Sequence, residues 1–239
     1  MIPLRDTIRS RHRPVMTWLI VAVNALVFMF QLSLGNQGLQ SFVNTYAFIP
    51  ARWQTDPIWF AVTMLTSMFM HGGWIHFLSN MWILFIFGDN VEDRMGPFGF
   101  LAFYLLGGLA AGVMQFAVFP NSLIPTLGAS GAIAGVMGAY LVLYPSARVV
   151  TLIPIFFFFT TINIPAVLYL GIWFVTQFFS GITSLGAVAV GGVAWWAHIG
   201  GFVFGLLMVK RFLFRPVPVP RTVNYYQTVE PPSRDRYRW

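Results

Sequence analysis

The chain contains no cysteine and few charged residues. The absence of cysteine excludes disulfide bonds and thiolate metal sites. Only 9% of the 239 residues are charged and 57% are hydrophobic, whereas soluble domains average about 25% charged residues. So few charges cannot give a chain of this size a water-compatible surface. We therefore expect a lipid bilayer to be its main solvent.

The sequence also lacks carboxylates within its apolar segments. All seven Asp and Glu residues lie outside these segments, which argues against a proton or ion pathway because such pathways usually need intramembrane carboxylates. The formal net charge of +7 would fit nucleic acid, but the basic residues cluster near the two ends of the chain and flank apolar segments. Anionic lipid headgroups explain this distribution better, so we expect a bilayer and no nucleic acid as partner.

Six apolar segments are candidates for membrane spans, because a spanning helix needs about 20 mostly apolar residues. They cover roughly residues 15–34, 60–87, 98–118, 128–144, 164–179 and 190–214. The sequence thus predicts an all-α, polytopic membrane protein with a six-helix bundle over residues 15–214. A basic cytoplasmic segment, 1–14, precedes the bundle. A proline-rich cytoplasmic tail, 215–239, follows it and is expected to be disordered.

The basic residues predict the side of the membrane on which the termini lie. With the N-terminus in the cytoplasm, Arg52 is the only one of the 14 Lys and Arg residues on the outer side. The positive-inside rule then places both termini in the cytoplasm, and we expect a plasma (inner) membrane location. The first apolar run is longer than a signal-peptide core of roughly 7–15 residues, so we expect a retained span. Residues 35–59 are too polar to span and are expected to lie along the outer interface.

A serine and a histidine stand at glycine-rich positions of two distant apolar segments. Ser130 follows Gly128 and Ala129 at the start of the fourth segment, and His198 lies in the sixth. An ionisable residue within a span is costly and is therefore a functional candidate, and a serine with a histidine suggests a nucleophile and its base. The short Gly-x-Ser-Gly motif by itself is better explained by an ordinary N-cap serine.

Small residues line one face of each of these two predicted helices. Spacings of three and four residues place them on a common face. They are Gly131, Gly135 and Gly138 in the fourth segment, and Ala194, Gly201 and Gly205, together with His198, in the sixth. Such faces let two helix backbones approach closely. We therefore expect the fourth and sixth helices to pack together and to bring Ser130 within reach of His198.

The second apolar segment supplies hydrogen-bond donors. His76 and Asn80 are four residues apart, so they lie one above the other on a helix face. Both side chains can donate hydrogen bonds, and with the free backbone N–H groups at the start of the fourth helix they could form an oxyanion hole. His71 points elsewhere and is expected to be structural, bonding a loop backbone.

A metal site is the main alternative explanation of the histidines. His71, His76 and His198 could form a three-histidine site. However, no carboxylate accompanies them, and their spacing differs from His-Glu-x-x-His. We therefore expect neither a metal nor another cofactor.

Four short motifs in this order make the chain resemble the rhomboid intramembrane serine proteases over about residues 15–214. The motifs are Ala51-Arg52-Trp53, His71-x-x-x-x-His76-x-x-x-Asn80, Gly128-Ala129-Ser130-Gly131 and Ala197-His198-Ile199-Gly200-Gly201-x-x-x-Gly205. Each motif is weak by itself, but all four on the predicted spans are highly specific. The resemblance implies a six-helix bundle with a water-accessible site that opens to the outside.

The resemblance also implies roles for individual residues. Ser130 would be the nucleophile and His198 the general base of a catalytic dyad. His76, Asn80 and the backbone N–H of Ser130 would form the oxyanion hole, and Gly128 would give the tight turn before the nucleophile. The activity implied is cleavage of single-pass membrane proteins within or near their spans, so transmembrane proteins are the expected substrates.

Two further residues are expected from the resemblance to support the first outer loop, and one position departs from the family. Arg52 and Trp53 would brace this loop. Some members carry a tyrosine four residues after the serine, stacked on the catalytic histidine, whereas this chain has Ala134, so His198 must be oriented by another group. An alternative function is that of a catalytically inactive relative that binds and escorts membrane proteins, but such relatives usually lack the serine or the histidine.

Overall fold

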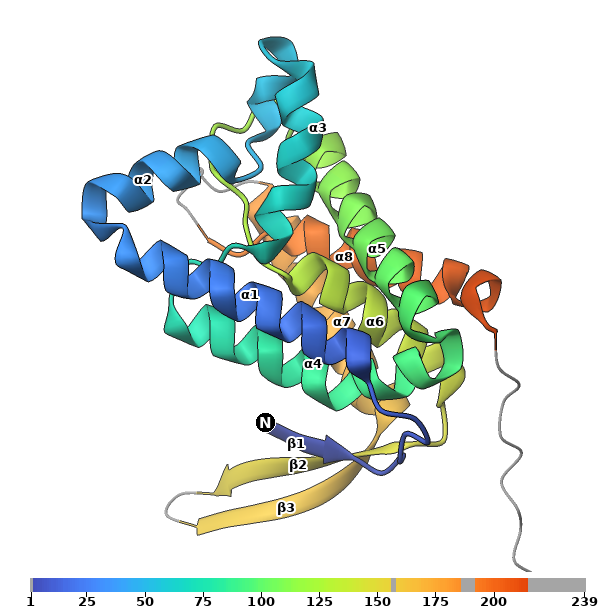
Figure 1. Ribbon diagram of the computed structural model, residues 1–239. Helices are drawn as coiled ribbons and strands as arrows, with labels where there is room; N and C mark the ends of the chain where they lie inside the picture. The colour runs from blue at the N-terminus through green and yellow to red at the C-terminus, as the bar shows by residue number, and fades with distance from the viewer. Residues whose placement is uncertain (1, 156–157, 186–191, 215–239) are drawn as a thin grey trace, which may run out of the picture.

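The computed structural model describes residues 2–155, 158–185 and 192–214 of the chain (Figure 1). The tail for which the sequence predicts disorder, residues 215–239, lies outside the described residues. Most of the described chain is helical. The α-helices are α1 (Val15–Ser33), α2 (Gly35–Tyr46), α3 (Pro57–Thr66), α4 (Trp74–Met95), α5 (Pro97–Val118), α6 (Ser130–Leu143), α7 (Ala166–Ser184) and α8 (Trp195–Met208). Three short 3-10 helices accompany them: η1 (Pro50–Gln54), η2 (Ser67–Phe69) and η3 (Val209–Phe212).

Helix length and hydropathy support part of the predicted set of spans. Among the described residues, α1, α5 and α7 are long and apolar enough to cross a membrane, and α3 with α4 would add a fourth span if this bent pair formed one. Helix α6 is apolar but has only 14 residues. The described helices thus give three or four spans by these criteria, and the count of six stays a prediction.

The second predicted span, residues 60–87, is wrong as a single helix. The chain bends by 81° between α3 with η2 and α4. Gly73 has a φ of 154°, a backbone conformation that side chains with a Cβ rarely adopt, and α4 begins at the next residue, Trp74. Because of this break, His76 and Asn80 lie in the first two turns of α4 rather than in the middle of a long helix.

The helical prediction holds for most of the described chain, but the all-α prediction did not include a three-stranded antiparallel sheet that the described residues form. The strands are β1 (Ile2–Asp6), β2 (Arg148–Ile155) and β3 (Phe158–Pro165), in the order β1-β2-β3. Ile2 pairs with Leu152, and Arg148 pairs with Pro165. The sheet lies along the outer side of α4, away from α2 and α3 (Figure 1), and Trp82 in the middle of α4 donates to the carbonyl oxygen of Pro3 on β1.

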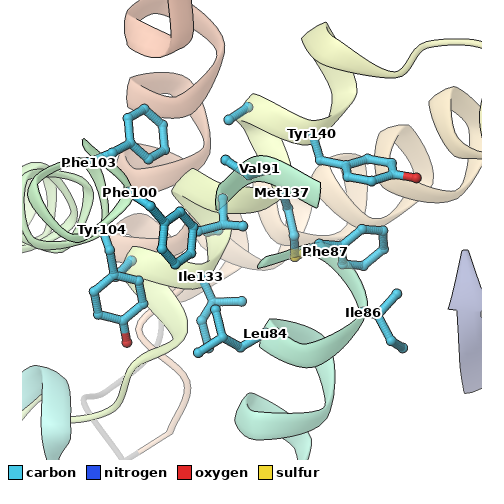
Figure 2. Packing of buried hydrophobic residues seen from close by; sticks show 14 of the residues in the cluster. Leu84, Ile86, Phe87, Val91, Phe100, Phe103, Tyr104, Ile133, Met137 and Tyr140 are labelled. Carbon is cyan, nitrogen blue, oxygen red and sulfur yellow. The ribbon is translucent and has the colours of Figure 1, made fainter. Parts of the chain in front are cut away.

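The hydrophobic core lies between α4, α5 and α6. Phe87, Phe100 and Tyr140 are buried there, and Figure 2 shows side chains of all three helices packed against one another. The rings of Phe87 and Tyr140 meet edge to face, with centroids 4.9 Å apart. This core fixes α6, and therefore its first residue, relative to α4.

Large apolar side chains also cover outer faces of the bundle. Leu26 on α1 is 71% exposed, and Phe179 on α7 is 62% exposed. Soluble monomers rarely expose large contiguous apolar surfaces. These faces therefore suit contact with lipid.

Candidate active site

Ser130 and His198 meet at the first turns of two helices. Ser130 is the first residue of α6, and His198 lies in the first turn of α8. Ser130 Oγ and His198 Nε2 are 2.8 Å apart, which is a hydrogen-bond distance. The two residues are separated by 68 positions in the sequence, and the packing of their helices brings them together.

Glycines allow the backbones of α6 and α8 to touch, as their spacing predicts. A Cβ atom on Gly201 would lie 2.0 Å from the carbonyl oxygen of Gly131, and one on Gly205 would lie 2.0 Å from that of Gly135. Real Cβ contacts are never so short, so each position excludes any larger residue without movement of the backbone. The contact surface of the two helices thus sets the distance between Ser130 and His198.

Gly128 forms the turn that precedes Ser130. Its φ is +124°, which a residue with a Cβ rarely adopts. A Cβ on Gly128 would also lie 2.6 Å from Cε1 of His76. Gly128 therefore allows both the turn and the close approach of the His76 ring to the serine loop.

His76 and Asn80 add hydrogen-bond donors to the surroundings of this loop. The backbone N–H of Gly72 donates to Nδ1 of His76 over 3.3 Å, so the ring proton of a neutral His76 lies on Nε2, the atom beside Gly128. Asn80 is buried, and its Nδ2 has no hydrogen-bond partner among the described residues. A buried amide without a partner is costly, and Asn80 also lines the cavity that contains Ser130.

A cavity of about 1460 Å³ joins these side chains. Ser130, His198, His76 and Asn80 all line it. No side chain caps the start of α6, where the first backbone N–H groups have no partner within the helix. The cavity therefore combines a nucleophile candidate, a base candidate and several donors.

The segment around Arg52 supports the loop that leads to Ser130. Phe48 and Thr126 exchange backbone hydrogen bonds of 2.7 and 3.0 Å. Arg52 Nη1 donates to the carbonyl oxygens of Thr45 and Ala47, at 3.2 and 3.3 Å. Trp53 is partly exposed, and the edge of its ring meets Phe116. The bracing of the first loop by Arg52 and Trp53 stays a prediction to which these contacts are relevant.

His71 lies apart from the cavity lining. Its ring is buried against Phe28 and Phe77, and the side chain of Gln31 bonds both the N–H and the carbonyl of His71. Gln31 thus holds the backbone of His71 in place, and the structural role expected for the His71 side chain stays a prediction. The described residues contain no group of three His, Asp or Glu side chains that could hold a metal ion.

Two residues of α7 contact His198 and were missed in the sequence. Gln177 Oε1 lies 2.7 Å from His198 Nδ1, and the ring of Trp173 lies at 5.9 Å from the imidazole with an interplanar angle of 32°. Gln177 is the only amide in the predicted span 164–179, which is the signal that could have identified it. Trp173 precedes it by four residues and so shares its helix face. Trp173 thus supplies the aromatic contact that Ala134 cannot make.

The fold and the site together define a mostly helical membrane protein with a hydrogen-bonded serine and histidine in a large cavity. The Rhomboid domain family matches residues 59–215, which is more than half of the chain. The protein belongs to the rhomboid family.

Curated relatives carry the same family name. The chain is 28% identical over 131 residues to Rhomboid-like protein 11, chloroplastic, of Arabidopsis thaliana (55% of this chain, 43% of the relative). It is 32% identical over 160 residues to RHOMBOID-like protein 4 of A. thaliana (64% and 34%). It is 31% identical over 152 residues to Presenilin-associated rhomboid-like protein A, mitochondrial, of Danio rerio (60% and 35%). The chain thus spans less than half the length of these relatives, whose names place two of them in different organelles.

Proposed function

We propose that this protein is an intramembrane serine endopeptidase that cleaves single-pass membrane proteins within or near their spans. The observation that carries the proposal is the 2.8 Å contact between Ser130 Oγ and His198 Nε2 in a cavity large enough for a peptide segment and water. A nucleophile within hydrogen-bond reach of its base is the arrangement that covalent catalysis by serine requires.

The reaction would proceed through an acyl-enzyme. As Ser130 Oγ attacks the substrate carbonyl carbon, His198 Nε2 accepts the hydroxyl proton and then donates it to the leaving amine, so that the peptide C–N bond breaks. Water in the cavity then attacks the resulting ester, with His198 accepting its proton and returning it to Ser130. This chemistry is complete with side chains alone and needs no metal or other cofactor.

The negative charge that develops on the substrate oxygen needs nearby donors. In this proposal the donors are Nε2–H of His76, Nδ2 of Asn80 and the backbone N–H of Ser130, three residues that line the same cavity. Each donor in such a hole is worth roughly 3 kcal/mol of transition-state stabilisation. Nδ2 of Asn80, which has no partner within the described part of the chain, supports this role because a substrate oxygen would satisfy it.

The length of α6 supports a site below the membrane surface. Its 14 residues rise about 21 Å at 1.5 Å each, whereas the hydrocarbon core is about 30 Å thick. If the C-terminal end of α6 lies at one surface, beside the sheet, then Ser130 stops about 9 Å short of the other surface. A cavity that opens toward that nearer surface would bring in the water that hydrolysis needs.

The distribution of basic residues supports an orientation. Arg148 and Lys210 follow the C-terminal ends of α6 and α8, and Arg5 on β1 pairs with Val150 on β2. The positive-inside rule would assign this side to the cytoplasm. Both termini would then be cytoplasmic, and the cavity would face the outside of the plasma membrane. The lipid bilayer would be the permanent partner and transmembrane proteins the substrates. A substrate helix must unwind locally before attack, because its backbone groups are bonded to one another.

The test is cleavage of a labelled single-span protein by the purified enzyme in detergent and in liposomes. Ser130→Ala and His198→Ala should each abolish cleavage and labelling by a fluorophosphonate probe while their thermal unfolding stays close to that of the wild type. Ser33→Ala, a change at an exposed serine on α1, is the matched control and should cleave at the wild-type rate. Unchanged turnover in Ser130→Ala would refute the proposal. Saturable binding without cleavage by the wild type would instead favour an escort function.

A further inference from the structure

We infer that Gln177 is a positioning residue that holds His198 in the tautomer with its proton on Nδ1. The inference rests on the proposed function, since it explains how the base of the proposed dyad is prepared for the reaction. Gln177 is buried on α7, and its Oε1 lies 2.7 Å from Nδ1 of His198. Nε2 of the same ring lies 2.8 Å from Ser130 Oγ.

The neighbours of Gln177 fix which end of its amide faces the histidine. The Thr176 hydroxyl donates to the carbonyl oxygen of Trp173 over 2.6 Å, so its oxygen is free to accept. Gln177 Nε2 donates to that hydroxyl oxygen at 3.3 Å. The amide nitrogen is therefore used within α7, and the amide oxygen points to His198.

The chemistry of the amide oxygen then determines the tautomer. A carbonyl oxygen can only accept a hydrogen bond, so the contact with Gln177 requires the proton on Nδ1. The lone pair of a neutral His198 is then on Nε2, facing the Ser130 hydroxyl, as a general base requires. The opposite tautomer would leave the Gln177 oxygen facing an unprotonated nitrogen and would remove the base from Ser130.

Aromatic side chains also restrain the imidazole ring of His198. Trp173 lies one turn before Gln177 on α7, and its ring is tilted by 32° to the imidazole at 5.9 Å. The edge of Trp195 meets the imidazole at 6.3 Å with an angle of 89°. The hydrogen bond to Gln177 sets the rotation of the ring, and the two indoles limit its tilt. Gln177 and Trp173 of α7 thus orient His198, which the short side chain of Ala134 cannot do.

An amide suits this position better than a carboxylate does. Gln177 lies in a helix that is long and apolar enough to cross a membrane, where a buried charge is expensive. A neutral acceptor orients the histidine without that cost. The orientation of His198 would consequently depend on a hydrogen bond rather than on an ion pair.

The experiment combines kinetics with nitrogen NMR of the full chain in detergent. Gln177→Met keeps an unbranched side chain of similar length but removes the acceptor. Its kcat should fall about 10- to 100-fold, the effect of losing one hydrogen bond and part of the tautomer preference, with KM within about twofold. Gln177→Glu keeps an acceptor but adds the cost of a buried charge, so it should recover part of the rate lost in Gln177→Met. Gln37→Met, the same change at an exposed position on α2, is the control and should be unaffected.

The NMR measurement separates this inference from the proposed protease function. In protein labelled with ¹⁵N-histidine, His198 is identified by its missing signals in His198→Ala. The wild type should show a protonated Nδ1 and an unprotonated Nε2, and Gln177→Met should shift both signals toward a tautomer mixture. Identical histidine signals in the two proteins would overturn the inference whatever the kinetics. If the wild type shows the Nδ1–H tautomer but neither cleaves substrate nor reacts with the probe, the protease proposal fails alone.

Discussion

Gly128 and His76 lie so close together that Gly128 has no room for a side chain. A Cβ on Gly128 would lie 2.6 Å from Cε1 and 2.7 Å from Nε2 of His76. The turn before Ser130 therefore packs directly against the first turns of α4. This contact places a donor of α4 beside the serine of α6.

Gly128→Ala should reduce cleavage at least 100-fold. The new methyl group displaces the His76 ring, and the φ of +124° at this position becomes strained. Both effects move groups that would stabilise the transition state, and a displacement of about 1 Å can cost about 100-fold in rate. The measurement is kcat/KM on a labelled single-span substrate.

The matched control for this variant is Gly171→Ala. A Cβ on Gly171 would meet nothing within 4 Å, and alanine is the better residue in a helix by about 1 kcal/mol. Its activity should stay within about twofold of the wild type. Wild-type rates in Gly128→Ala would show that the His76 ring is not part of the reactive site.

The residues around Ser130 could be predicted from the sequence because they break the apolar pattern. Ser130 and His198 are polar residues in apolar segments, and the glycine spacing identified the helix faces that join them. Gln177 could not be recognised in this way, because an uncharged amide does not stand out by charge in an apolar segment. The contact with His198 depends on the rotation of α7, which its own sequence does not determine.

Asn80→Leu should lower kcat about 100-fold with little change in KM, because one donor to the developing oxyanion is lost. The same change should leave the free energy of unfolding equal or higher. Nδ2 of Asn80 is buried without a partner among the described residues, and an apolar side chain of similar size removes that penalty.

Kinetics and thermal unfolding of the same preparation test the Asn80→Leu prediction, with the exposed Asn36→Leu as control. A loss of rate without a loss of stability is the signature of a functional group. An equal loss of both would mean that Asn80 is structural.

Gly205→Ala should act mainly on stability. Its Cβ would lie 2.0 Å from the carbonyl oxygen of Gly135, so α6 and α8 must separate. Forcing extra atoms into a packed interface typically costs about 1–3 kcal/mol. Thermal unfolding in detergent should show a lower midpoint than both the wild type and Gly171→Ala. A midpoint equal to that of Gly171→Ala would show that the two helices are less tightly packed than described.

The sheet could not be predicted from hydropathy. Most residues of β2 and β3 are apolar, β-branched or aromatic, and such residues suit both strands and membrane helices. Strand β1 pairs with residues about 150 positions away, as in the pair Ile2 and Leu152, and no local pattern in the N-terminal segment indicates that partner. Only the assembled bundle, which holds the ends of α6 and α7 together, creates the edge on which β1 docks.

Asp6 should make the docking of β1 depend on pH. Its carboxylate accepts hydrogen bonds from Tyr140 Oη at 2.5 Å and Asn90 Nδ2 at 2.9 Å. Burial, opposed by the Tyr140 hydrogen bond and reinforced by the nearby charge of Asp89, raises the pKa of Asp6 from 3.8 to about 7. The docked strand therefore holds a proton that the undocked strand releases. The contribution of protonated Asp6 to the stability of the docked strand is complete below about pH 4 and is lost as the pH rises through 7.

Hydrogen exchange of residues 2–6, corrected for intrinsic rates, tests the role of Asp6. Protection of β1 should be greater at pH 5 than at pH 8 in the wild type. Asp6→Asn keeps an oxygen that can accept from Tyr140 but cannot ionise, so its protection should be the same at both values. Exchange at the pairing residues of β2 should follow β1, while the centres of α5 and α6 should not respond. A wild-type pH response that persists in Asp6→Asn would assign the effect to another group, and a response of the whole bundle would show that β1 does not undock independently.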